Sequence, residues 1–359
     1  MVQYAAFMRL KLFKITGVLL LAAVVLCSAG CGSFIARRIA QAPNSYPDWI
    51  APDARVSLDF NSGFLTNFPA HYFNASPPEA RLRYRVIEPA DYNLQVITSN
   101  WMEDNEPQFT FTFTAVTPGP TNQWTAHPRG TVILLHGWGV AQFSMAPWAL
   151  RLAQEGWRCV LIDLRGHGKS TGKRIFFGVQ EVNDFSQLLD ELDHQHLLIT
   201  PVMAVGESYG AVIAIRAQSA DARLRAVVAI NPYASLSNAI INIRRDYAPW
   251  VPAFLVRSGI KKLPKLLGVP AADLDTTTII ARHPFPILFF AGENDKVSPP
   301  DEVRKLRSLA APGSEFILVP GATHESLTYF FKDLAPPIIA WLDNEAPLGA
   351  VIPVEHPHP

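Results

Sequence analysis

From residue 131 onward, short apolar runs alternate with segments that carry apolar residues at helical spacing. Continuous apolar runs of this length are typical of strands buried on both faces of a parallel sheet. Strands joined by helices predict an α/β fold, with a mostly parallel sheet covered by helices on both faces. The expected strands are 131–135, 159–163, 201–205, 224–230, 286–290 and 315–319. The expected helices are 143–155, 179–196, 208–219, 300–310 and 327–343.

Two earlier segments have different residue patterns. Apolar and polar residues alternate over 109–114, which predicts a half-buried strand with 94–98 as its partner. Residues 36–81 are rich in proline and asparagine, so we expect an extended tether or lightly structured arm there. These patterns place the main folded domain at 82–346 and a proline-rich, flexible tail at 347–359.

A long insert, about 232–283, separates two of the expected strands, and its length predicts a small helical cap. Between Arg244 and Leu267 the insert carries six basic residues and one acid, Asp246. The simpler interpretation is a solvated basic face over a packed cap. The alternative is a surface that touches anionic lipid or accepts an acyl chain. The apolar residues of the insert include Trp250, Phe254, Leu255, Leu263, Leu266 and Leu267.

The first 35 residues have the order of an export signal. A basic stretch ends at Lys14, an apolar run follows over 15–26, and small residues occupy 28–32. We therefore expect an exported chain that is tethered to a membrane, with its folded part on the periplasmic or extracytoplasmic face.

The fate of this N-terminal segment has several alternatives. It resembles a bacterial lipoprotein signal, in which Cys31 becomes the lipidated first residue of the mature chain. Ser28, however, stands where that family prefers leucine. The segment also suits an uncleaved anchor, because 15–36 is close to the ~20 residues that span a bilayer. Ordinary signal-peptide cleavage is a further alternative.

Charge and cysteine usage narrow the classes of function. Lys+Arg and Asp+Glu number 31 each, so no basic excess points to nucleic acid. Hydrophobic residues make up 49% and charged residues 17%, which argues against disorder over the whole chain. Cys159 lies in an expected strand and reads as a small buried hydrophobe. Cysteine and histidine spacings fit no metal site, so we expect neither a metal nor another cofactor.

The sequence Gly206-Glu207-Ser208-Tyr209-Gly210 joins an expected strand to an expected helix. A serine in this context lies on a sharp turn at a helix N-terminus, where its hydroxyl stands clear of the sheet. Gly206 and Gly210 avoid side chains that would collide with neighbouring backbone. Ser208 is therefore our candidate nucleophile.

A serine hydroxyl needs a general base and an acid that orients the base. His324 follows an expected strand in a turn, whereas the other histidines include several in a helix or in the tail. Asp295 follows the preceding strand, with Glu293 as the alternative acid. The other position after a strand where an acid would fit, Asn231, carries no carboxylate. The order Ser208, Asp295, His324 is the one that this serine turn leads us to expect.

Two backbone N–H groups are expected to stabilise negative charge on the reacting oxygen. One belongs to Tyr209, which follows the candidate nucleophile. The other comes from the loop 136–139, where Trp138 is favoured over Gly139. His136 is expected to brace this loop rather than to act as the base.

Taken together, these motifs resemble the α/β-hydrolase superfamily, most closely its branch of monoacylglycerol lipases, carboxylesterases and serine aminopeptidase-like proteins. The resemblance covers about residues 83–345 and implies the α/β-hydrolase fold. In relatives the stretch that resembles Asp163 to Ser170 is structural, so Arg165 and His167 are not expected to be catalytic. The motifs are His136-Gly137-Trp138-Gly139, Asp163 to Ser170, Gly206 to Gly210, Gly292 to Asp295 and Gly321 to His324.

The resemblance implies a serine hydrolase that cleaves a carboxylic ester or thioester through an acyl-enzyme on Ser208. Its expected partners are a small-molecule acyl substrate and a membrane, without a cofactor or nucleic acid. A peptidase or an acyltransferase would use the same triad, because one fold hosts many chemistries. A non-catalytic exported binding module on this fold is the remaining alternative.

Overall fold

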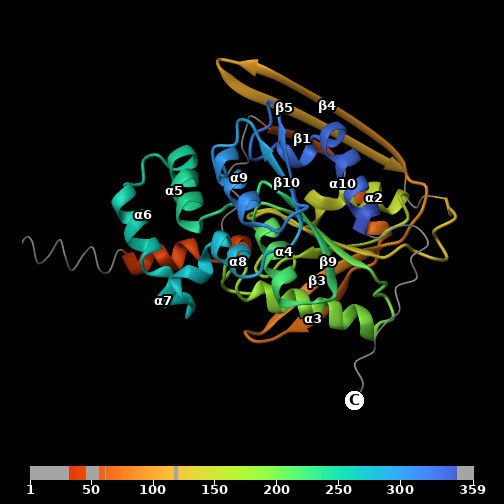
Figure 1. Cartoon of the computed structure of the whole chain (residues 1–359), viewed down its shortest axis with the longest axis horizontal. Coiled ribbons are helices and arrows are strands. Elements are labelled where there is room, and N and C mark those ends of the chain that lie inside the picture. The colour runs from red at the N-terminus through yellow and green to blue at the C-terminus, as the bar shows by residue number, and fades with distance from the viewer. Residues whose placement is uncertain (1–31, 46–55, 61, 117–119, 346–359) are drawn as a thin grey trace, which may run out of the picture.

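The computed structural model describes residues 32–45, 56–60, 62–116 and 120–345, and its centre is an eight-stranded sheet (Figure 1). The strand order is β11-β10-β9-β8-β6-β7-β3-β2. Strands β6 to β11 pair in parallel, and the antiparallel strands β3 and β2 follow β7 at one edge. The predicted mostly parallel sheet is confirmed. The strands are β2 (His71–Ala75), β3 (Ala80–Ile87), β6 (Thr131–Leu135), β7 (Arg158–Asp163), β8 (Val202–Glu207), β9 (Leu224–Ile230), β10 (Ile287–Gly292) and β11 (Glu315–Val319).

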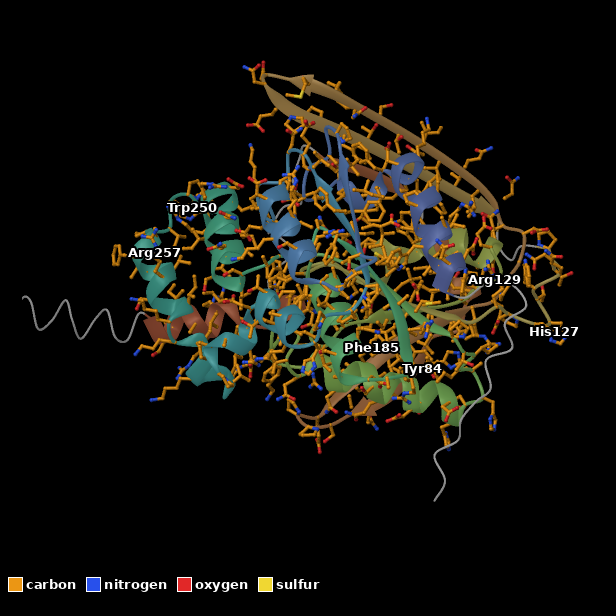
Figure 2. The ribbon with its side chains drawn as sticks, viewed as in Figure 1. Tyr84, His127, Arg129, Phe185, Trp250 and Arg257 are labelled. Atoms are coloured by element: carbon orange, nitrogen blue, oxygen red, sulfur yellow. The ribbon has the colours of Figure 1, made fainter. Side chains whose placement is uncertain are left out.

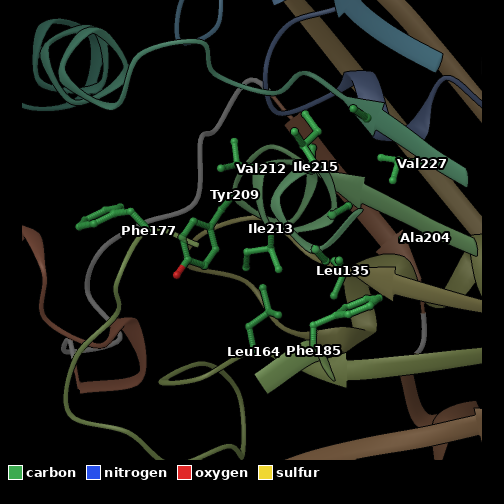
Figure 3. Packing of buried hydrophobic residues seen from close by; sticks show 14 of the residues in the cluster. Leu135, Leu164, Phe177, Phe185, Ala204, Tyr209, Val212, Ile213, Ile215 and Val227 are labelled. Carbon is green, nitrogen blue, oxygen red and sulfur yellow. The ribbon is translucent and has the colours of Figure 1, made fainter. Parts of the chain in front are cut away.

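Helices cover both faces of this sheet, which explains why its strands are apolar without alternation. In β6, Ile133 and Leu135 join the core on the side of α3, α4 and α9, while Val132 joins the core on the side of α2 and α10. Figure 3 shows the first of these cores, in which Leu135 and Phe185 lie near Ile213 of α4. The helices are α2 (Ala146–Gln154), α3 (Glu181–His194), α4 (Tyr209–Ala220), α9 (Pro300–Leu309) and α10 (Phe331–Glu345).

A second sheet of three strands, in the order β1-β5-β4, lies beside α10 (Figure 1). Strand β5 pairs antiparallel with β4, as the alternation over 109–114 predicts, and parallel with β1. Its buried rings stack on the residues that lead into α10. The ring centroids of Phe109 and Phe330, and those of Phe111 and Tyr329, are 4.9 Å apart. The strands are β1 (Val56–Phe60), β4 (Asn93–Glu103) and β5 (Glu106–Val116).

Within 36–81, where we expect a tether or a lightly structured arm, the described residues 56–60 and 71–75 form strands rather than an extended tether. Strand β1 pairs with β5, and β2 forms an edge of the large sheet. Residues of β2 alternate between solvent and core, with Phe73 and Ala75 buried. Pro69 lies between β1 and β2, and Pro77 and Pro78 occupy the turn from β2 to β3. Proline content alone was misleading, because proline also marks the turns that separate short strands.

The insert between β9 and β10 folds into a layer of helices at one end of the molecule (Figure 1). Helix α5 packs against α6, and α8 packs against α4 and α9, so the cap is continuous with the main domain. Buried Leu263 and Ile280 belong to the same core as α3 and α4. The cap helices are α5 (Leu236–Tyr247), α6 (Ala253–Ile260), α7 (Leu263–Leu267) and α8 (Thr276–Arg282).

Residues 32–39 form a helix that packs on α6 of the cap. Glycine makes this close approach feasible, because a Cβ at Gly259 would overlap the side chain of Ile35. A Cβ at Gly32 would likewise overlap the hydroxyl of Ser258. The folded part therefore includes residues 32–35, and the predicted boundary of the N-terminal segment at residue 35 is too late.

Three other predictions concern residues that lie outside the described ones. These are the apolar run 15–26, the lipidation candidate Cys31 and the tail 347–359. Within the part of the chain that is described, no helix combines the length and the hydropathy that a membrane span requires.

The aromatic contact between β5 and the start of α10 makes a large contribution to stability. Phe111 is fully buried, so Phe111→Ala should lower the free energy of unfolding by about 3–5 kcal/mol through lost burial and a cavity. Urea denaturation measures this change. Ile97→Ala is the matched control, because Ile97 is 64% exposed on β4 of the same hairpin. Equal effects of the two changes would contradict this packing.

Candidate active site

Ser208 lies on the turn between β8 and α4 with φ 47° and ψ −107°. Positive φ is uncommon for a residue with a side chain, so the surroundings must hold the turn in place. The backbone N–H of Ser208 donates to the Ile230 carbonyl at 2.8 Å and to Oδ1 of Asn231 at 3.1 Å. A Cβ at Gly206 would overlap the backbone of Gly210, and one at Gly210 would overlap the end of β6. Both glycines therefore permit the close packing that the turn needs.

The side chains of Ser208, His324 and Asp295 form one line of hydrogen bonds. Oγ of Ser208 is 2.9 Å from Nε2 of His324, and Nδ1 of His324 is 2.8 Å from Oδ2 of Asp295. The other carboxylate oxygen, Oδ1, accepts the backbone N–H groups of Val297 at 2.8 Å and Ser298 at 2.7 Å. These bonds fix the carboxylate, which in turn favours the His324 tautomer with its proton on Nδ1. Nε2 then faces the serine hydroxyl as a proton acceptor.

Burial and charge act in opposite directions on His324. Burial alone would lower its pKa, but the charge and hydrogen bond of Asp295, with a further contribution from Glu207, raise the pKa above the ordinary 6.5. Burial also raises the pKa of Glu207, although the nearby charge of His324 opposes this shift. The site therefore stabilises a positive charge on the imidazole, which is what a base needs when it takes a proton from serine.

The alternative acid, Glu293, has a different position. Its Oε2 accepts the backbone N–H of Gly321 at 3.0 Å, so it braces the turn that leads to His324. The two loops lie close together, because a Cβ at Gly292 would approach the Ala322 carbonyl oxygen to 2.5 Å. The carboxylate that contacts the imidazole belongs to Asp295.

Asn231 is a site residue that sequence reasoning treated only as a missing carboxylate. It is fully buried at the end of β9. Its Oδ1 accepts the N–H of Ser208 at 3.1 Å, and its Nδ2 donates to the His324 carbonyl at 2.7 Å. One amide thus ties the turn of Ser208 to the loop of His324. The sequence did hold a signal for this role. Asn231 directly follows an apolar strand, which is the next strand along the chain after the one that precedes Ser208.

The loop after β6 lies against the serine turn, as the predicted oxyanion loop requires. A Cβ at Gly137 would contact the carboxyl group of Glu207, next to Ser208. Tyr209 is the first residue of α4, so its N–H has no acceptor within the helix. Trp138 lies in the turn of the facing loop. The assignment of the Tyr209 and Trp138 N–H groups as oxyanion donors stays a prediction.

His136 is buried behind this loop. Its Nε2 accepts the N–H of Leu164 at 3.0 Å, and its Nδ1 lies 2.7 Å from the carbonyl of Gly137. Burial lowers the pKa of His136 to about 4, so it is neutral at physiological pH. Such a histidine braces backbone and is remote from proton transfer at Ser208.

The side chains from Asp163 to Ser170 likewise form bonds that stabilise the fold. Arg165 pairs with Asp184 through bonds of 2.8 and 2.5 Å in the interior. Nδ1 of His167 lies 2.9 Å from the Arg165 carbonyl, and burial lowers the pKa of His167 to about 3. Neither side chain reaches the line of bonds at Ser208.

A small cavity of about 20 Å³ borders His324. Side chains from three separate parts of the chain line it, including Tyr247 of α5, Lys296 and Pro107 at the tip of the β4–β5 hairpin. Nζ of Lys296 lies 3.5 Å from a carboxylate oxygen of Glu106, which ties the hairpin tip to the acid loop. The cavity has room for about one water molecule, so a larger group must reach Ser208 from its exposed side.

Nothing in the described residues suggests a metal centre. The histidines, cysteines and acids of the described ranges form no group of three or more that would hold an ion.

Comparison with solved structures bears on the fold. The Pyrococcus furiosus esterase Pf2001 superposes with a TM-score of 0.56 and 18% identity, over 80% of this chain and 94% of that chain. The α/β hydrolase GrgF from Penicillium sp. sh18 gives 0.53 and 14% identity, over 77% of this chain and 99% of that one. Our chain has the α/β-hydrolase fold. Likeness at this level of identity concerns the fold alone.

Comparison of the sequence adds three further similarities. A family model described as serine aminopeptidase, S33, matches residues 126–280, which include Ser208 and stop before Asp295. The α/β hydrolase domain-containing protein WAV2 of Arabidopsis thaliana is 26% identical over 203 residues, 55% of this chain and 64% of WAV2. The uncharacterized protein YqkD of Bacillus subtilis (strain 168) is 24% identical over 180 residues, 49% of this chain and 58% of YqkD. The chain thus spans less than two thirds of the length of these curated relatives.

The bridge made by Asn231 should affect reactivity more than substrate binding. Asn231→Ala removes both of its bonds, so Ser208 and His324 lose their common support. We expect the rate at which Ser208 reacts with a fluorophosphonate to fall roughly 10- to 100-fold. Asn183→Ala is the control, because Nδ2 of Asn183 donates to the Ser76 carbonyl beside β2, at the edge of the large sheet. An unchanged labelling rate for a folded Asn231→Ala variant would contradict the positioning role.

The pH dependence of that labelling reports on His324. The base acts when neutral, and its pKa is raised, so the reaction should be half-maximal above pH 6.5 on the acidic side. Glu207→Gln removes a charge that raises the pKa of His324 and should move this midpoint to lower pH. Glu293→Gln alters a carboxylate that braces a turn and should leave the midpoint in place. A midpoint that does not respond to Glu207→Gln would show that Glu207 does not act on the base.

Proposed function

We propose that this protein is a serine hydrolase that cleaves a carboxylic ester through an acyl-enzyme on Ser208. The observation that carries the proposal is the continuous line of hydrogen bonds from Ser208 through His324 to Asp295, at 2.9 and 2.8 Å. Each group has the partner that its chemical role requires. The serine has a base, the base has an orienting acid, and the acid has two backbone donors.

In the proposed reaction, Oγ of Ser208 attacks the substrate carbonyl while Nε2 of His324 takes its proton. The carbonyl oxygen becomes an oxyanion and accepts the N–H groups that we assign to Tyr209 and Trp138. His324 then gives the proton to the leaving alcohol as the tetrahedral intermediate collapses to an ester on Ser208. Water, deprotonated by the same imidazole, hydrolyses this acyl-enzyme.

An apolar acyl group fits the solvent-exposed surface beside Ser208. The loop and short helix after β6 expose large apolar side chains beside the serine turn. Trp138 is 42% exposed, Val140 37% and Phe143 38%. This composition favours an acyl chain over a charged group. The two structural neighbours include one described as an esterase, which agrees with an ester substrate.

The similarity to the serine aminopeptidase model supports a second candidate, the cleavage of an aminoacyl amide. An aminopeptidase must hold the substrate's ammonium group with a carboxylate near the nucleophile. Asp246 borders the cavity beside His324, but Nε of Arg245 lies 3.3 Å from it. The ester therefore remains the function that the geometry favours.

Covalent labelling tests the role of Ser208. The full chain should react with a fluorophosphonate probe, and Ser208→Ala should abolish the reaction because no other activated hydroxyl is expected. Ser237→Ala, which alters an exposed serine on α5, should label like the unmodified chain. Equal labelling of the Ser208→Ala variant, or none with the unmodified chain, would contradict the proposal and favour a binding module.

A panel of p-nitrophenyl esters and aminoacyl p-nitroanilides separates the two candidate substrates. We expect turnover of esters, with a preference among acyl lengths, and loss of nearly all of it in Ser208→Ala. Turnover of the anilides in preference to the esters would assign the chain to the peptidase alternative.

A further inference from the structure

The cap carries an exposed surface of mixed apolar and basic character on its outer side. We call this surface the cap face and define it by Phe34, Trp250, Phe254, Arg257, Lys261 and Lys262. Its large apolar side chains are more exposed than most others in the protein, at 61% for Phe34, 77% for Trp250 and 65% for Phe254. Figure 2 shows Trp250 and Arg257 at the same end of the molecule.

The cap face is held together by the helix over 32–39 and by α6. Glycine at 32 and at 259 lets these helices approach closely, and Ile35 and Ala36 fill the space between them. The opposite sides of the two helices then face solvent, and they carry Phe34 and Phe254. Exposed rings on packed, regular helices are not explained by the fold itself, because burial of such rings would be favourable.

The charge of this region has one sign. Residues 32–39 carry two basic side chains and residues 250–272 carry four, and neither segment contains an acid. The chain as a whole is balanced, with 31 basic and 31 acidic residues. A surface that interleaves exposed aromatic rings with lysine and arginine is complementary to a bilayer that contains anionic lipid.

The place where the chain enters the described structure also indicates a bilayer as the partner of the cap face. Gly32 packs beside Ser258 of α6, so the chain enters the described structure at the cap. The sequence places the end of an apolar run at Leu26, six residues earlier. Six residues span at most about 20 Å. If a bilayer holds the run 15–26, Gly32, where the chain meets the cap, lies within that distance of its surface.

We propose that the cap face docks on the surface of a bilayer containing anionic phospholipid, with Trp250 and Phe254 inserted among the headgroups. The basic side chains attract the surface, and the rings enter the interface that amphipathic helices occupy. Trp250 follows Tyr247, which lines the cavity beside His324, by three residues. Docking therefore places the edge of the candidate active site near the lipid surface.

A fluorescent reporter in the full chain tests this docking without reference to catalysis. Phe254 is replaced by an environment-sensitive fluorescent amino acid, and the chain is reconstituted in nanodiscs of phosphatidylcholine with or without phosphatidylglycerol. In the anionic nanodiscs we expect a blue shift of its emission and a loss of intensity to brominated lipid. The matched control carries the same reporter at Ile97, which is 64% exposed on the β4–β5 hairpin, and should show neither change.

A charge-reversal variant tests the contribution of the basic residues. The triple change Arg257→Glu, Lys261→Glu and Lys262→Glu alters exposed side chains, so the fold should persist, as circular dichroism checks. It should remove the blue shift at position 254 while the chain stays in the nanodisc.

Several results would overturn the proposal. Emission at position 254 that matches the control at 97 in anionic nanodiscs would show that the cap face stays in water. Equal quenching in neutral and anionic nanodiscs would remove the role of anionic lipid. A blue shift that appears in detergent and grows with protein concentration would assign the cap face to contact between copies of the chain.

Discussion

The backbone conformation of Ser208 is the constraint on which the candidate site depends. A residue with a side chain is held at φ 47°, at a cost on the order of 1–3 kcal/mol. The turn cannot relax, because β8 lies between β6 and β9 in the middle of the sheet and all three strands are buried. Gly206 and Gly210 let the start of α4 pack against the end of β6. This packing presents the hydroxyl to His324 at 2.9 Å.

The same edge of the sheet supplies every other group of the site. Asp295 and His324 follow the carboxyl ends of β10 and β11, where the ends of parallel strands bring distant segments together. The buried amide of Asn231 links the serine turn to the histidine loop, so that three separate loops act as one support. His136 also follows the carboxyl end of a strand, β6, but its ring is bonded to the backbone of the interior instead.

The parts that could be predicted from the sequence are those with a local signal. The serine turn is defined by five consecutive residues, and the strands before Asp295 and His324 are short apolar runs. Strands β1 and β2, within the expected tether or arm over 36–81, could not be predicted, since their partners are other strands that no local pattern reveals. The bonds of Asn231 and the approach of the hairpin tip to Lys296 join residues far apart in sequence, so only the fold brings them together.

We propose that Ser208 forms a covalent acyl intermediate with the support of His324 and Asp295. Rapid mixing of the full chain with p-nitrophenyl acetate, followed by peptide mapping of the acid-quenched protein, measures this intermediate directly. We expect a burst of p-nitrophenolate close to one equivalent per chain, with the acetyl group on the peptide that contains Ser208. An acetyl group on another residue, or turnover that leaves Ser208 unmodified at every time point, would contradict it.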